Sequence, residues 1–171
     1  MPRLADLLVE PPLAAEVEQK FLAFRSGLLL IGGSSSMAAN VFVYALLRSM
    51  SEAQQRLIFI LETGITFLLR HNRSVVLQCE LGSDVDSVDQ GLRTALTLNP
   101  NVIYVRDIAN PKDLATVVKA VDSQVFTVVT VSVLDAELLL PGGPESLDQR
   151  SLRGVWHVDR AESDRLRVLM E

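Results

Sequence analysis

Residues 27–50 read GLLLIGGSSSMAANVFVYALLRSM, and this stretch decides the fold. The run 28–31 is short and entirely apolar, which is typical of a β-strand buried on both faces. A loop of small residues follows at 32–36, and the strongly apolar stretch from about 37 to 50 predicts a helix. A buried strand, a small-residue loop and a helix in this order predict an α/β protein with a largely parallel sheet.

The flanking sequence repeats the alternation of strands and helices. Helices are expected at 11–24, 84–98 and 113–121, and strands at 57–61, 75–79, 102–105 and 124–134. Two prolines around two glycines make 141–144 a loop, and a short helix is expected at 147–152. Two further apolar segments then predict a terminal β-hairpin over about 154–170.

Length and composition bound the class of protein. A chain of 171 residues fits one domain, and 49% apolar with 22% charged residues exclude disorder. The mean hydropathy of +0.28 is high, so either both faces of the sheet are covered or part of the surface meets a partner. No apolar run approaches the roughly 18 residues of a membrane span, so membrane insertion is not expected.

Charge and cysteine usage narrow the function. The net charge of −5 argues against electrostatic binding of nucleic acid or anionic lipid. The one cysteine, Cys79, fits a reducing cytoplasm and is expected in the core rather than as a nucleophile. His71 and His157 have no zinc-ligand spacing around them, so no metal site is expected. The early charges Arg3 and Asp6 argue against a secretory signal peptide, so we expect a cytoplasmic protein.

The small-residue loop has the setting of a phosphate-binding P-loop but lacks its chemistry. The motif G-x-x-x-x-G-K-[ST], aligned on Gly33, would need a lysine at Ala39 and a hydroxyl at Asn40. Without that lysine, no positive charge in the loop would offset the charge of a bound phosphate. Asn40 is also a poor replacement for the hydroxyl that holds Mg²⁺. We interpret 32–40 as a degenerate Walker A loop. Its candidate phosphate-binding residues are Gly33, Ser34, Ser35, Ser36, Ala39 and Asn40.

Several segments resemble the motor ATPases of type II secretion and type IV pili, the retraction ATPases in particular. Residues 91–105, GLRTALTLNPNVIYV, are close to that family's ALRSALREDPDIILV, which leads into the Walker B carboxylate. Residues 27–33 resemble the approach to Walker A, 57–67 the Asp-box strand, and 151–155 the SLRGV segment before a closing hairpin. The resemblance runs from about Leu13 onward. It implies a RecA-like P-loop NTPase core with a C-terminal β-hairpin.

The departures from the family pattern fall in its catalytic boxes. Arg106 and Asp107 stand where Walker B has Gly-Glu, and the Asp box keeps Glu62 but has threonines in place of acids. A valine occupies the histidine position of the His box, near 128–132. Phosphoryl transfer needs phosphate clamping, Mg²⁺ and water positioning together, so we expect ATPase activity to be lost. Glu62 and Asp107 remain as candidate nucleotide-binding residues.

The resemblance also implies what is missing around the core. The family's N-terminal PAS-like domain has no counterpart, and the stretch before the hairpin is cut to about 135–150. We therefore expect a single RecA-like domain over 1–171. We therefore do not expect such a chain to build the ring interface of the motors in the same way.

Three functional hypotheses follow. The first is a non-catalytic relative, with no cofactor, that acts as a structural or regulatory module by associating with itself or with pilus or secretion motor proteins. The second is a sensor that binds a nucleotide without hydrolysing it. The third is an unrelated enzyme that uses the pair Glu62 and Asp107. Two further segments have two interpretations each. Arg106 and Asp107 form either part of a site or a surface ion pair. The basic stretch 70–73 is either a solvated connection between strands or a surface that contacts an acidic partner.

Overall fold

The computed structural model describes residues 2–120, 125–131, 152–161 and 165–170. Within them, one seven-stranded sheet has the order β3–β2–β4–β5–β1–β6–β7. The strands are β1 (Gly27–Gly32), β2 (Leu57–Glu62), β3 (Val75–Glu80), β4 (Val102–Ile108), β5 (Phe126–Val131), β6 (Leu152–Arg160) and β7 (Leu166–Met170). All neighbours run parallel except β6 and β7, which form an antiparallel hairpin. The predicted α/β class, the largely parallel sheet and the terminal hairpin are confirmed.

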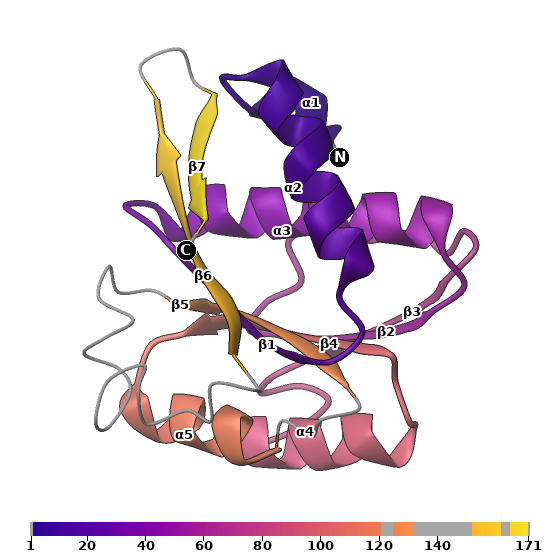
Figure 1. The fold of residues 1–171 in the computed structure, drawn as a ribbon. Helices are drawn as coiled ribbons and strands as arrows, with labels where there is room; N and C mark the ends of the chain where they lie inside the picture. Colours follow the sequence, from indigo (N-terminus) through magenta and orange to yellow (C-terminus); the bar gives the residue numbers. More distant parts are fainter. Residues whose placement is uncertain (1, 121–124, 132–151, 162–164, 171) are drawn as a thin grey trace.

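Helices cover both faces of this sheet (Figure 1). On one face lie α1 (Leu4–Leu7), α2 (Pro11–Ala23) and α3 (Ser36–Ala53), and on the other α4 (Val88–Thr97) and α5 (Pro111–Ala120). Each face has its own apolar core. Every residue of β1 and β5 is buried, as expected for apolar runs that do not alternate. Double coverage of the sheet therefore accounts for much of the high mean hydropathy.

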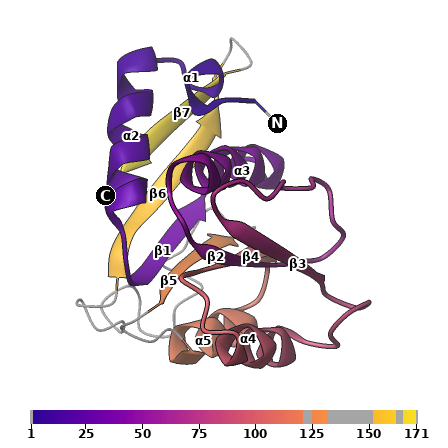
Figure 2. The ribbon, with the colours of Figure 1, turned by 90° about the vertical axis from the view of Figure 1, so that its right-hand side faces the viewer.

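Helix α3 is buried on most of its circumference. Tyr44, Ala45 and Leu47 are at most 2% exposed and Val41 is half-buried, so the apolar face of this helix covers the sheet. The helix begins after Ser35, whose hydroxyl accepts a hydrogen bond from the Ala38 amide in an N-cap. Its other side is covered by α2 and the hairpin, which lie beside each other in Figure 2.

An aromatic cluster joins α2 to the sheet. Phe21 and Phe24 pack against Phe126 of β5 and Trp156 of β6, with ring centroids 5.1–6.4 Å apart. Trp156 is fully buried. Such rings bury large apolar areas, so the cluster fixes α2 and the hairpin on the same side of the sheet.

Several element boundaries differ from the prediction. Helix α4 begins at Val88, because 84–87 form a turn in which Asp84 accepts from the Glu80 amide and Ser87 caps the helix. Strand β4 continues to Ile108, three residues beyond its predicted end. Leu152 opens strand β6 instead of ending the expected short helix.

Parts of other predictions cannot be compared with the structure. The helix predicted at 113–121 is α5, which begins earlier at Pro111, and its last predicted residue lies outside the described residues. Of the strand predicted at 124–134, residues 126–131 are found, and residue 124 and residues 132–134 lie outside. The loop predicted at 141–144 and most of the short helix lie outside as well.

The topology gathers the candidate residues at one edge. Because β1, β2, β4 and β5 are parallel, their carboxyl ends meet on the same side of the sheet. The loop after β1, the last residue of β2 and the end of β4 therefore come together there. In open α/β sheets this edge is where ligands bind.

Candidate functional site

The loop between β1 and α3 packs closely on the neighbouring strand β6. A Cβ atom on Gly33 would lie 1.9 Å from the carbonyl oxygen of Val158, so only glycine fits there. Strand β6 runs beside β1 with Gly32 opposite His157, which brings Val158 and Asp159 alongside the loop. The glycine expected for a phosphate loop is thus also required by strand packing.

The Ser34 amide is bonded to a carboxylate from the terminal hairpin. Its nitrogen donates to Oδ1 of Asp159 at 2.9 Å, across 125 residues of sequence. Hydrogen bonds from the Ser34 backbone and hydroxyl, together with the nearby His157 and Arg167, lower the pKa of Asp159. A loop amide that the sequence assigned to phosphate therefore holds an anionic group of the protein itself.

The next loop residues also bond within the chain. The Ser35 hydroxyl caps α3, and the Ser36 hydroxyl donates to Oδ1 of Asp107 at 2.6 Å. Ala39, at the lysine position of the motif, is 1% exposed and brings no charge.

Asn40 lies at the centre of a buried polar network. Its amide nitrogen donates to both carboxylate oxygens of Asp107 at 3.0 Å, and its own oxygen accepts from Tyr104 at 2.7 Å and from Thr130 at 2.9 Å. Asn40, Tyr104 and Thr130 are all 0% exposed. Burial raises the pKa of Tyr104, which keeps its hydroxyl protonated as a donor. The network ties α3 to β4 and β5.

Asp107 adopts an unusual backbone conformation. Its φ of 55° is in the left-handed region, which costs a residue with a side chain about 1–2 kcal/mol. The β4–β5 register shifts between Val105 and Ile108, and the Asp107 amide donates to the Thr130 hydroxyl at 2.9 Å. This irregularity turns the Asp107 carboxylate toward Ser36 and Asn40.

Arg106 joins the two candidate carboxylates. Its Nη1 lies 3.0 Å from Oε2 of Glu62, and its Nε lies 3.0 Å from Oδ2 of Asp107. The side chains of Arg106, Asp107 and Glu62 are 8%, 26% and 0% exposed, so the predicted Arg106–Asp107 ion pair is present, partly buried, and extended by Glu62. Burial opposes the charged guanidinium, but the hydrogen bond with Glu62 and the charge of Asp107 leave the pKa of Arg106 above its usual value.

Glu62 has further partners on its buried side. Its Oε1 accepts from the Tyr44 hydroxyl at 2.6 Å and from Nε2 of Gln78 at 2.9 Å. Burial, followed by the hydrogen bond to Glu62, raises the pKa of Tyr44. A charged carboxylate can be buried at this place because every one of its oxygens accepts from a donor.

The structure thus brings together four of the predicted residues and separates the others. Ser36, Asn40, Glu62 and Asp107 form one network through Arg106, whereas Gly33, Ser34, Ser35 and Ala39 are outside it. Sequence reasoning missed the polar partners Tyr44, Gln78, Tyr104, Thr130 and Asp159. A polar residue within a mostly apolar buried strand, such as Thr130 in β5, is a signal that could have found one of them.

A nucleotide with Mg²⁺ is what the resemblance implies, but the donor set does not fit it. Each oxygen of Glu62 and Asp107 already accepts a hydrogen bond from the chain, and Arg106 holds one oxygen of each. No cluster of three or more His, Cys, Asp or Glu suited to a metal occurs in the described residues. The lysine position is Ala39, so a phosphate would find no local cation there.

Other predicted residues have structural roles. Cys79 is buried in a core, and burial raises the pKa of its thiol, as expected for an unreactive core residue. Residues 70–73 are exposed, and Nδ1 of His71 accepts from the Val76 amide at 3.0 Å. Among the described residues no helix is both long and apolar enough to cross a membrane.

Comparison with solved structures identifies the fold. The pilus retraction motor PilT with bound ADP superposes with a TM-score of 0.80 at 20% identity, over 99% of this chain and 53% of that one. The ATPase DotB of Legionella pneumophila gives a TM-score of 0.76 at 18% identity, over 99% of this chain and 50% of that one. The predicted RecA-like fold is confirmed.

Sequence comparison points in the same direction. A twitching motility protein of Neisseria gonorrhoeae is 25% identical over 117 residues, which are 68% of this chain and 31% of that protein. No protein-family model matches the sequence. The chain spans about a third of this relative and about half of each similar structure. The chain is thus similar in fold to a pilus retraction motor and a DotB ATPase, and in sequence to a twitching motility protein.

Proposed function

We propose that this chain is a non-catalytic relative of the pilus and secretion ATPases. It acts in such machinery as a structural or regulatory module that contacts a second copy of itself or the motor proteins. The observation that carries the proposal is the closed network of Ser36, Asn40, Arg106, Asp107 and Glu62, in which the polar groups bond to one another.

The chemistry of phosphoryl transfer supports this proposal. Hydrolysis requires a cation at the transferred phosphate, a metal ion held by free ligand oxygens, and a positioned water molecule. Ala39 supplies no cation, and the carboxylates that could hold a metal already accept hydrogen bonds from the chain. Without these parts the scaffold offers a surface for contacts with other proteins rather than a reaction centre.

The test is an ATPase assay on the purified chain with Mg²⁺. We expect phosphate release at the background rate for the unchanged protein and for Asp107→Ala alike. Asp86→Ala, which removes an exposed carboxylate away from the network, is the matched control. ATP turnover that Asp107→Ala abolishes and Asp86→Ala preserves would refute the proposal.

Calorimetry with ATP and ADP at millimolar concentration distinguishes this proposal from the alternative of a nucleotide sensor. Because the Ser35 and Ser36 hydroxyls are engaged by α3 and Asp107, we expect no heat of binding. Saturable binding without turnover would favour the sensor instead. Light scattering then measures self-association, and a chain that stays monomeric at high concentration points to motor proteins as the partner.

A further inference from the structure

The Glu62–Arg106–Asp107 cluster contains two carboxylates and one guanidinium. Two carboxylates on the neighbouring strands β2 and β4 approach each other at the edge where a metal ion would be expected. Like charges in a poorly solvated place repel, so a positive charge must lie between them. The chain supplies one itself, from the residue directly before Asp107.

We propose that Arg106 is the resident cation of this two-carboxylate site, taking the place of a metal ion and keeping divalent cations out. The inference rests on the proposed function, since it explains how the site remains stable without its nucleotide chemistry. It goes further in naming the group that occupies the site.

The contacts of the guanidinium support this role. Nε bonds to Asp107, and Nη1 bonds to Glu62, Thr66 Oγ1 and the Gly64 carbonyl at 2.8–3.2 Å. The group therefore reaches both carboxylates and is held on its outer side by neutral oxygens. Thr66 accepts this bond as a hydroxyl, at a position where the related ATPases usually carry an acid. With a threonine at this position, the guanidinium contacts two carboxylates, those of Glu62 and Asp107, rather than three.

The other donors complete the shell around the carboxylates. Tyr44 and Gln78 donate to Oε1 of Glu62, the oxygen that Arg106 does not contact, and Ser36 and Asn40 donate to Asp107. A divalent ion would have to displace Arg106 and would then leave a buried guanidinium without partners, which is costly. We infer that removing the guanidinium, rather than adding metal, is what opens the site.

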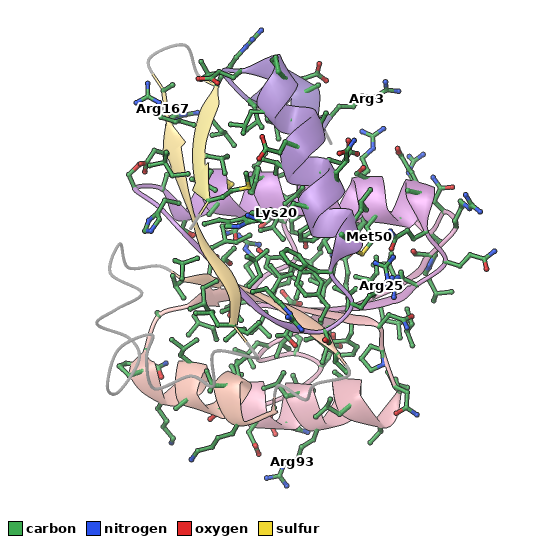
Figure 3. All side chains as sticks on the ribbon, viewed as in Figure 1. Arg3, Lys20, Arg25, Met50, Arg93 and Arg167 are labelled. Carbon is green, nitrogen blue, oxygen red and sulfur yellow. The ribbon has the colours of Figure 1, made fainter. Side chains whose placement is uncertain are left out.

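The experiment compares Mn²⁺ binding to the unchanged chain, Arg106→Met and Arg93→Met. Arg93 is the matched control, because it points into solvent from α4 (Figure 3) and pairs across one helical turn with Asp89. Bound Mn²⁺ is measured by the loss of its free paramagnetic resonance signal. We expect Arg106→Met to bind one Mn²⁺ at least tenfold more tightly than the other two proteins, and its melting temperature to rise with Mn²⁺.

A double variant assigns the binding to the carboxylates. Arg106→Met with Asp107→Asn should lose the gained Mn²⁺ affinity. Equal Mn²⁺ binding by the unchanged chain and Arg106→Met, or none by a folded Arg106→Met, would overturn the proposal. If Arg106→Met is unfolded without metal, refolding on Mn²⁺ addition supports the proposal and failure to refold contradicts it.

A thermodynamic cycle tests the resident cation without any metal. Arg106→Met, Glu62→Gln and the double variant are compared by urea unfolding. If Arg106 neutralises Glu62, the double variant must be less destabilised than the sum of the single variants, whereas additive effects would contradict the proposal. ATP turnover by the unchanged chain would refute the proposed function and leave this result standing, so the two proposals fail separately.

Discussion

In two contacts of this protein a carboxylate is bonded by a donor from the same chain, in one case in the interior and in the other near the surface. At Arg106 a guanidinium lies between two carboxylates, with Glu62 fully buried, and at Ser34 a backbone amide meets the partly exposed carboxylate of Asp159. In both places the chain fills a binding position with one of its own charges. The difference in burial determines how much each contact contributes to stability, because water competes with an exposed contact but cannot replace a buried one.

The largest effect on stability is expected from Arg106→Met. Removing one partner of a buried ion pair leaves an uncompensated charge, which typically costs about 3–5 kcal/mol. Urea unfolding measures the loss, and Arg93→Met, which breaks an exposed pair within α4, should cost no more than about 0.5 kcal/mol. Similar small losses for both variants would show that the Arg106 cluster is solvated and would remove the contrast between the two contacts.

A smaller effect is expected from Gly33→Ala, at the residue directly before Ser34. The new methyl group would meet the Val158 backbone oxygen, so β1 and β6 must separate, at an expected cost of about 1–3 kcal/mol. Because the clash is with the backbone, adding Val158→Ala should not restore stability. Thermal unfolding of both variants measures this, and a Gly33→Ala protein as stable as the unchanged chain would contradict the close approach.

The smallest effect is expected from Asp159→Ala, about 0.5–1 kcal/mol at neutral pH, because the carboxylate is partly exposed. The lowered folded-state pKa of Asp159 means that its contribution is present above its unfolded pKa of about 4. It is lost as the pH falls through the folded-state value. Urea unfolding at pH 7 and in this acidic window should therefore show the difference from the unchanged chain shrinking with pH. Asp86→Ala is the control, and a difference independent of pH would contradict the Ser34 contact.

Much of the fold could be predicted because its signals are local. The apolar runs that became β1 and β2 need no distant information to be recognised as buried strands. The start of α4 was misplaced even though Ser87, with Gln90 three residues later, is a readable capping signal. The turn before it depends on Asp84 accepting from the Glu80 amide, which the spacing of apolar residues does not report.

The candidate site was only half predictable. Ser36 and Asn40 could be chosen from the P-loop pattern, and Glu62 and Asp107 from the resemblance to the Asp box and Walker B of the pilus and secretion ATPases. That Arg106 bonds to Glu62, 44 residues away, depends on the register between β2 and β4. Asp159 could not be chosen at all, because nothing near it in sequence marks it as a partner of Ser34.

The sequence by itself determined the α/β class, the terminal hairpin, the resemblance to the pilus and secretion ATPases and the alanine at the lysine position. These follow from residue types and local spacing. Only the tertiary structure decided that Arg106 lies between two carboxylates and that Asp159 bonds to the loop. The physical reason is that parallel strands bring remote segments to one edge, and packing and register select which side chains meet there.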